Sequence, residues 1–293
     1  MITITPDYYR NFKCVANMCK HSCCIGWQID IDDITLQKYN SLSGDFAYRL
    51  KSSIKFDESP HFNLDKNERC PFLNKNGLCD IITDLGEDML CQICSDHPRF
   101  RNYYGDFIEV GLGLACEAAA KIILTSNEKV RLNLTDKALH IPIISFREKL
   151  FNILQDRNLS LENRINNMLD TVGASLPTDT DWHSVFNSLE KMDKLWDGYL
   201  LRIKDGIDKM PYDNSLDTAY EQLAVYLIFR HFLDCQYDEK IKERILFVAL
   251  ICKVIRAMNT SNTLNELIEI ARIYSCEIEY SDENINRLLS ELG

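Results

Sequence analysis

Four thiols lie within eleven residues in the stretch Cys14-Val-Ala-Asn-Met-Cys19-Lys-His-Ser-Cys23-Cys24-Ile-Gly-Trp27. A hydrophobic core does not need this density of cysteine, whereas closely spaced thiols can reach one metal centre with little chain to order. Five further cysteines follow before residue 117, at Cys70, Cys79, Cys91, Cys94 and Cys116. The other 177 of the 293 residues hold only three more. The N-terminal part is therefore predicted to fold around thiolate-bound metal.

The candidate metal ligands are the nine N-terminal cysteines: Cys14, Cys19, Cys23, Cys24, Cys70, Cys79, Cys91, Cys94 and Cys116. Tetrahedral zinc sites take four ligands, and so does a [4Fe-4S] cluster, so nine thiols suffice for one or two sites. A crowded set made only of cysteine favours an iron-sulfur cluster over zinc, which is the alternative.

Composition limits the cellular setting and the partners. No run approaches the roughly 18 apolar residues of a membrane span, and the N-terminus lacks the basic and then apolar order of a signal peptide. We therefore expect a cytoplasmic protein without a membrane partner, in a compartment where thiols stay reduced and metal binding is favoured over disulfides. The net charge of −11 offers no basic footprint for nucleic acid, and a lysine-bearing protein partner suits the surface better.

The first part of the chain is rich in glycine and proline, and short helices are expected at residues 33–48, 87–95 and 115–125. In the second of these, Cys91 and Cys94 would lie one above the other on a single helix. A short strand is expected at residues 130–134. We expect a cysteine-rich metal or iron-sulfur domain at 1–126, a connecting segment at 127–142 and an α-helical domain at 143–293. The predicted fold class is mainly α: a cysteine-rich, loop-rich metal-binding N-terminal half followed by an α-helical bundle.

The C-terminal half shows apolar residues at helical spacing, most clearly from Tyr220 to His231 and from Ile241 to Ile255. Cys252 occupies one of these stripes and is interpreted as a core residue. Cys235 and Cys276 are interpreted as structural, and His231 as a hydrogen-bonded core histidine.

Several residues that are not cysteines also stand out near the thiols. Trp27, Asp30 and Arg99 are the candidate cofactor-binding residues. His97 and Arg99 flank Pro98, where the two side chains can hydrogen-bond cluster sulfurs or a ligand carboxylate, or can simply form a solvated turn.

The chain resembles the flagellin lysine-N-methylases, known as FliB, and their broader relatives, the CxxCxxCC proteins described as zinc- or iron-chelating. The resemblance is carried by Cys23-Cys24-Ile-Gly26-Trp27-Gln-Ile-Asp30, Cys70-Pro71-Phe72-Leu73, Gly77-Leu-Cys79-Asp-Ile, Leu85-Gly86-Glu87, Leu90-Cys91-x-x-Cys94 and Pro98-Arg99. It is dense over residues 7–125 and is seen again from Tyr220 to Phe232. The chain departs from the family pattern around Cys116, where it reads Ala115-Cys116-Glu117-Ala118 in place of a proline and a serine.

The resemblance implies an enzyme, a protein-lysine N-methyltransferase that uses S-adenosylmethionine, carries an iron-sulfur cluster and acts on flagellin or another lysine-bearing protein. Methyl transfer needs a neutral amine, and lysine, with a usual pKa of about 10.4, is mostly protonated at neutral pH. The sequence offers Asp30, Asp32, Glu109 and several tyrosines as candidate bases and does not choose among them. Two other classes of protein remain open: a non-catalytic zinc- or iron-chelating protein and an electron-transfer module.

Overall fold

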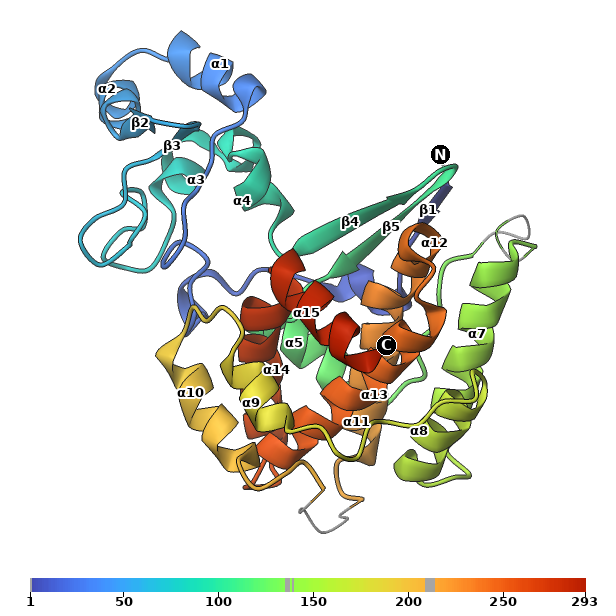
Figure 1. The fold of residues 1–293 in the computed structure, drawn as a ribbon. Helices are drawn as coiled ribbons and strands as arrows, with labels where there is room; N and C mark the ends of the chain where they lie inside the picture. Colours follow the sequence, from blue (N-terminus) through green and yellow to red (C-terminus); the bar gives the residue numbers. More distant parts are fainter. Residues whose placement is uncertain (1, 135–137, 139, 209–213) are drawn as a thin grey trace. The chain divides into compact units, whose positions relative to one another are not determined.

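The computed structural model describes residues 2–134, 138, 140–208 and 214–293, and these group into two compact units (Figure 1). The smaller unit is Lys13–Phe100, and the larger unit joins Met1–Phe12 to Arg101–Gly293. The chain passes from one unit to the other between residues 12 and 13 and again between residues 100 and 101. The boundary expected from the sequence is the segment 127–142. Eight of the nine N-terminal cysteines lie in the smaller unit, and Cys116 lies in the larger one.

Short elements joined by long turns make up the smaller unit. They are η2 (Ala16–Met18), α1 (Asp33–Ser41), α2 (Asp45–Ser52), β2 (Ile54–Phe56), β3 (Pro60–Phe62), α3 (Asp80–Leu85), η3 (Glu87–Met89) and α4 (Gln92–Asp96). Strands β2 and β3 form an antiparallel pair. Aromatic and aliphatic side chains fill the core between these elements, with Tyr39, Phe62 and Phe72 at its centre.

Two of the expected helices are interrupted, so their predictions were wrong in detail. The helix expected at 33–48 is two helices, because Gly44 between them has φ +95°, a conformation that ends one helix and starts the next. The helix expected at 87–95 is the short turn η3 followed by α4, because Leu90 and Cys91 have extended backbones. Cys91 therefore precedes α4 and does not lie within it.

A three-stranded sheet in the order β1-β5-β4 begins the larger unit, with β1 parallel to β5. Its strands are β1 (Ile2–Ile4), β4 (Arg99–Tyr104) and β5 (Phe107–Leu112). The helical elements are η1 (Asp7–Asn11), α5 (Glu117–Leu124), α7 (Pro142–Leu154), α8 (Leu161–Asp170), α9 (Trp182–Asn187), α10 (Lys194–Leu200), η4 (Leu201–Ile203), α11 (Asp217–His231), η5 (Phe232–Asp234), α12 (Cys235–Asp238), α13 (Ile241–Met258), α14 (Leu264–Tyr274), the π-helix η6 (Ser275–Glu279) and α15 (Asp282–Leu292).

Helix α11 is the centre of the larger unit, where it packs against α13, α5 and α7 (Figure 1). Almost every residue of α11 is buried, so the helix is enclosed on all sides and not only along one stripe. Cys252 and Cys235 are buried, as expected, and His231 is a buried, hydrogen-bonded core residue, as expected. Residues 130–134 form only a single bridge, from Leu132 to Pro6, in place of the expected strand.

The prediction of a mainly α protein is confirmed by this element content. The finer prediction, a loop-rich metal-binding half followed by a bundle, stays a prediction. Among the described residues, no helix combines the length and the apolar character needed to cross a membrane.

Candidate metal centre

Five thiols of the smaller unit share one core. Cys70 and Cys91 are buried within it, at 6% and 0% exposure. Cys24, Cys79 and Cys94 are half-buried and pack against the same core. These five residues are called the inner thiols below. Of the remaining candidates in this unit, Cys14 is exposed and Cys19 and Cys23 are half-exposed.

Backbone pairing brings the first two cysteine segments together. The Cys70 N–H donates to the carbonyl oxygen of Cys24 at 2.8 Å, and Gly26 N–H donates to the Glu68 carbonyl at 3.0 Å. Gly26 has φ +92°, which a residue with a side chain rarely adopts, so glycine is needed at this turn. The turn therefore holds Cys24 next to Cys70 although 46 positions separate them in the chain.

A second tight loop brings Cys79 back to the Cys70 segment. Asp80 N–H donates to the Phe72 carbonyl at 2.8 Å, and Leu73 forms a bridge with Cys79. At the tip of this loop Gly77 has φ +75°, and an added Cβ would lie 3.2 Å from the Cβ of Asn17. Cys79 is thus brought to the inner thiols by a loop whose tip requires glycine.

Cys91 and the start of α4 are held by Tyr39 of α1 and by Asp32, which precedes α1 as its N-cap. The Tyr39 hydroxyl donates to the Met89 carbonyl at 2.7 Å and lies 3.5 Å from the Cys91 sulfur. The Asp32 carboxylate accepts the N–H of Gln92, the first residue of α4, at 2.8 Å. From the sequence, Asp32 is expected only as a candidate base, and the roles of Asp32 and Tyr39 in holding the Cys91 segment are not predicted. The N-cap pattern Asp32-Asp33-Ile34-Thr35 is the sequence signal that could have identified the first of these roles.

The inner thiols affect one another electrostatically. A hydrogen bond from Cys94 lowers the pKa of Cys91, and the same hydrogen bond raises the pKa of Cys94, as do burial and the neighbouring thiols. Burial raises the pKa of Cys70 to about 12 and also raises that of Cys79. Thiols must lose their protons to ligate a metal, so metal binding by these residues would depend on pH.

The pKa of Cys24, like that of Cys91, is lowered, in this case to about 7. The first cause is a hydrogen bond from its neighbour Cys23, which outweighs the opposing effect of burial. At neutral pH a substantial fraction of Cys24 is therefore thiolate.

The chemical type of the inner thiols favours metal binding, whereas their arrangement in the structure does not form a metal site. Five inner thiols are the donor set of an all-cysteine centre. Yet within the described parts of the chain, no group of three or more His, Cys, Asp or Glu side chains is arranged to hold a metal ion. Two of the inner thiols, Cys91 and Cys94, are instead hydrogen-bonded to each other. By its chemistry the donor set fits a thiolate-bound centre, but the described residues are not arranged as a metal-ion site.

The three candidate cofactor-binding residues lie in different surroundings. Trp27 packs against the core of the inner thiols and donates its indole N–H to the Cys23 carbonyl at 2.7 Å. Asp30 is exposed and accepts hydrogen bonds from Gln28 at 2.9 Å and Ser59 at 3.0 Å. Arg99 follows α4 and donates to the Ser95 carbonyl at 3.3 Å. Trp27 is thus the member of this set closest in structure to the thiols.

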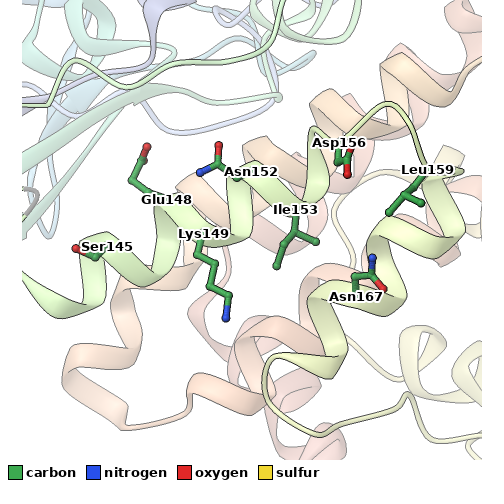
Figure 2. A pocket seen from close by; sticks show the side chains of 8 residues that line it. All are labelled: Ser145, Glu148, Lys149, Asn152, Ile153, Asp156, Leu159 and Asn167. Atoms are coloured by element: carbon green, nitrogen blue, oxygen red, sulfur yellow. The ribbon is translucent and has the colours of Figure 1, made fainter.

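A surface cavity of about 420 Å³ lies along α7 in the larger unit (Figure 2). Figure 2 shows Glu148 and Asn152 pointing to one side of this helix and Lys149 and Ile153 to the other. The polar groups that line the cavity do not converge on one position.

Known relatives were found by comparison of sequences. A lysine-N-methylase of Salmonella choleraesuis is 30% identical over 181 residues, and one of Salmonella typhimurium is 28% identical over 184 residues. Each of these matches covers 56% of this chain and 43% of the relative. A flagellar biosynthetic protein FliU of Salmonella muenchen is 28% identical over 144 residues, which are 45% of this chain and 82% of that protein.

No family model matches the chain, and no solved structure matches it. The chain spans less than half the length of the two lysine-N-methylases that it matches. The three matches therefore identify the chain as a FliB-like relative of the lysine-N-methylases.

Proposed function

We propose that this protein is a lysine N-methyltransferase that transfers the methyl group of S-adenosylmethionine to lysine side chains of flagellin and carries a cysteine-ligated iron-sulfur cluster. The observation that carries the proposal is the combination of lysine-N-methylase relatives with five thiols in one core of the smaller unit. Zinc is the alternative metal. A non-catalytic zinc- or iron-chelating protein and an electron-transfer module are the alternative functions.

The inner thiols are the proposed ligands that the described contacts support best. A [4Fe-4S] cluster is held by four thiolates, and the inner thiols exceed this number by one. Cys14, Cys19 and Cys23 remain proposed ligands from the sequence, as does Cys116 in the larger unit. A bound cluster supplies an electron-transfer centre, and its binding free energy adds to the stability of the fold that holds it.

For methyl transfer, the chain must provide a means to deprotonate the lysine, a surface for the sulfonium of the methyl donor and a partner for the donor's carboxylate. The lysine nitrogen attacks the methyl carbon, the carbon–sulfur bond breaks, and the sulfonium becomes a neutral thioether. The ammonium proton must leave before the attack, so a base or a desolvating site is needed. Trp27 offers an aromatic face for the sulfonium cation, and Arg99 offers a guanidinium for the carboxylate of the methyl donor.

The three candidate bases, Asp30, Asp32 and Glu109, differ in their contacts and therefore in their suitability to accept the lysine proton. Both oxygens of Asp32 accept hydrogen bonds, from Thr35 and Gln92, and these hold its pKa below the usual value although burial opposes them. Glu109 is fully buried and paired with Arg147. Asp30 is exposed, so among the three it is the carboxylate that a substrate amine can approach.

Binding of the methyl donor to the anaerobically purified full-length chain tests the proposal. We expect a brown protein that contains iron and sulfide and binds S-adenosylmethionine in a calorimetric titration. Cys70→Ser should lose the metal. Cys252→Ser is the matched control, because this thiol is also buried but lies in the core of the larger unit, and it should keep the metal.

The alternatives predict other results in the same experiment. A colourless zinc protein that does not bind S-adenosylmethionine would be a chelating protein. A cluster that is reduced and reoxidised reversibly, in a chain that does not bind S-adenosylmethionine, would be an electron-transfer module. Either result would refute the proposed methyltransferase.

A further inference from the structure

A buried carboxylate in the larger unit collects three hydrogen bonds from three separate side chains. Glu279 ends the π-helix η6, and its side chain is fully buried. It accepts hydrogen bonds from the Tyr226 hydroxyl at 2.7 Å, the Ser275 hydroxyl at 2.5 Å and the Nε2–H of His231 at 3.0 Å. A π-turn inserts one residue into a helix and so changes the direction of the side chains that follow it, and such turns are frequent at functional sites.

The protonation states in this network follow from its contacts. Burial lowers the pKa of His231, so the ring is neutral and donates Nε2–H. Burial would raise the pKa of Glu279, but the hydrogen bond from His231 and the charge of Arg230 hold it below its usual value. Glu279 is therefore a buried anion with three donors, which is the arrangement that makes such a charge tolerable.

Tyr226 connects this anion to the backbone that leads into α5. Its hydroxyl oxygen accepts the Leu114 N–H at 3.3 Å while its proton is donated to Glu279. Two residues later, Cys116 occupies the N-cap position of α5: its carbonyl accepts the Ala120 N–H at 2.8 Å, and its own N–H donates to Gly113 at 3.4 Å. The turn Gly113–Cys116 is thus anchored to α11 through one phenol.

We infer that Tyr226 and Glu279 are positioning residues that hold the Gly113–Cys116 turn, and with it the thiol of Cys116, in a fixed orientation at the start of α5. Glu279 orients the phenol, and the phenol oxygen holds the Leu114 amide. The functional meaning of this inference rests on the proposed function, in which Cys116 is one of the proposed metal thiolates. Tyr226, Glu279 and the turn all lie in the larger unit, so the positioning can be tested whether or not the chain binds a metal.

Four variants of the full-length chain separate positioning from general stability. Tyr226→Phe removes the hydroxyl and both of its hydrogen bonds. Tyr274→Phe is the matched control, because the hydroxyl of this buried tyrosine on α14 has no hydrogen-bond partner among the described residues. Glu279→Ala removes the acceptor of the phenol. Glu279→Gln is the conservative rescue, since its amide oxygen can replace Oε2 and its amide N–H can donate to His231 after a change of tautomer.

Two measurements are made on each variant: amide hydrogen exchange of residues 112–118 and the rate at which iodoacetamide labels Cys116, both by mass spectrometry of the metal-free chain. Labelling of the exposed Cys14 is the internal reference. Tyr226→Phe and Glu279→Ala should accelerate exchange of this segment at least about fivefold, the effect of losing one hydrogen bond, and should change the labelling ratio of Cys116 to Cys14. Tyr274→Phe and Glu279→Gln should match the unmodified chain in both measurements.

Equal exchange and equal labelling in Tyr226→Phe and Tyr274→Phe would overturn the inference. So would a failure of Glu279→Gln to restore the behaviour lost in Glu279→Ala. The metal content of the same proteins, purified without oxygen, tests the functional meaning: it should fall in Tyr226→Phe and Glu279→Ala and stay unchanged in the other two. If the unmodified chain held no metal, the proposed centre would fail, while exchange and labelling would still decide whether the network positions Cys116.

Discussion

The Asp32 carboxylate accepts a hydrogen bond from the backbone N–H of Gln92, sixty residues further along the chain, at 2.8 Å. The same carboxylate accepts the Thr35 N–H at 2.9 Å and so caps α1. Because Gln92 directly follows Cys91, one side chain fixes both the start of α1 and the turn that carries two of the inner thiols. The smaller unit therefore depends on this carboxylate for the position of its last cysteine pair.

Replacement of Asp32 by alanine tests this dependence. Asp32→Ala should lower the free energy of unfolding of the smaller unit by about 2–3 kcal/mol, because a helix cap and a hydrogen bond to a charged acceptor are lost together. Asp33→Ala is the control, since Asp33 is exposed in the first turn of the same helix. The measurement is urea unfolding followed by amide exchange in residues 13–100. Equal losses in the two variants would contradict the double role of Asp32.

The larger unit contains a fully buried ion pair between Glu109 on β5 and Arg147 on α7. Within the part of the chain that the structure describes, Glu109 Oε2 and two guanidinium nitrogens of Arg147 lack hydrogen-bond partners. Arg147→Met should destabilise the larger unit by about 3–5 kcal/mol, because the carboxylate is left buried and unpaired. The double variant Glu109→Leu/Arg147→Met should recover most of this loss. Thermal unfolding of the three proteins checks the prediction, which fails if the double variant is as unstable as Arg147→Met.

The carboxylate of Glu109 should also make the free energy of unfolding depend on pH. Burial raises the pKa of Glu109 from 4.5 to about 7, although Arg147 opposes the shift. A group whose pKa is higher in the folded chain contributes stability that is complete below the unfolded pKa and is lost as pH rises through the folded pKa. The free energy of unfolding should therefore fall between pH 4.5 and about pH 7 more steeply in the unmodified chain than in Glu109→Gln. Parallel curves for the two proteins would contradict the raised pKa.

Local patterns in the sequence account for much of the fold. The density of cysteine indicates that the N-terminal thiols gather, and five of them do share one core. The apolar stripe from Tyr220 to His231 predicts a buried helix, and α11 is that helix. Both signals are local: a thiol spacing in one case and a helical period in the other.

Features that depend on contacts between distant residues could not be predicted in this way. The extended backbone at Leu90 and Cys91 follows from contacts with Asp32 and Tyr39, which no local pattern around Cys91 reveals. Strand β1 pairs with β5 about one hundred residues later. Helix α5 packs on α11 and α14, whereas the boundary expected at 127–142 separates it from both. Periodicity describes one element at a time and contains no information on such pairings.

Removal of the metal should affect the two units differently. Cys24 and Cys91 are separated by 67 positions, so a metal that binds both would close a long loop and contribute to the folding free energy of the smaller unit. The helices of the larger unit are buried against one another, and we expect them to persist. Circular dichroism and amide exchange before and after chelator treatment check this expectation. A single transition in which residues 13–100 and 214–293 unfold together would contradict it.

The proposed lysine methylation is measured most directly by mass spectrometry of flagellin after incubation with the anaerobically purified protein and S-adenosylmethionine carrying a deuterated methyl group. The account predicts labelled methyl groups on lysine side chains of flagellin, formed at the same rate by Cys252→Ser and not formed by Cys70→Ser. Unlabelled flagellin in the presence of a metal-loaded protein that has bound the methyl donor would contradict it.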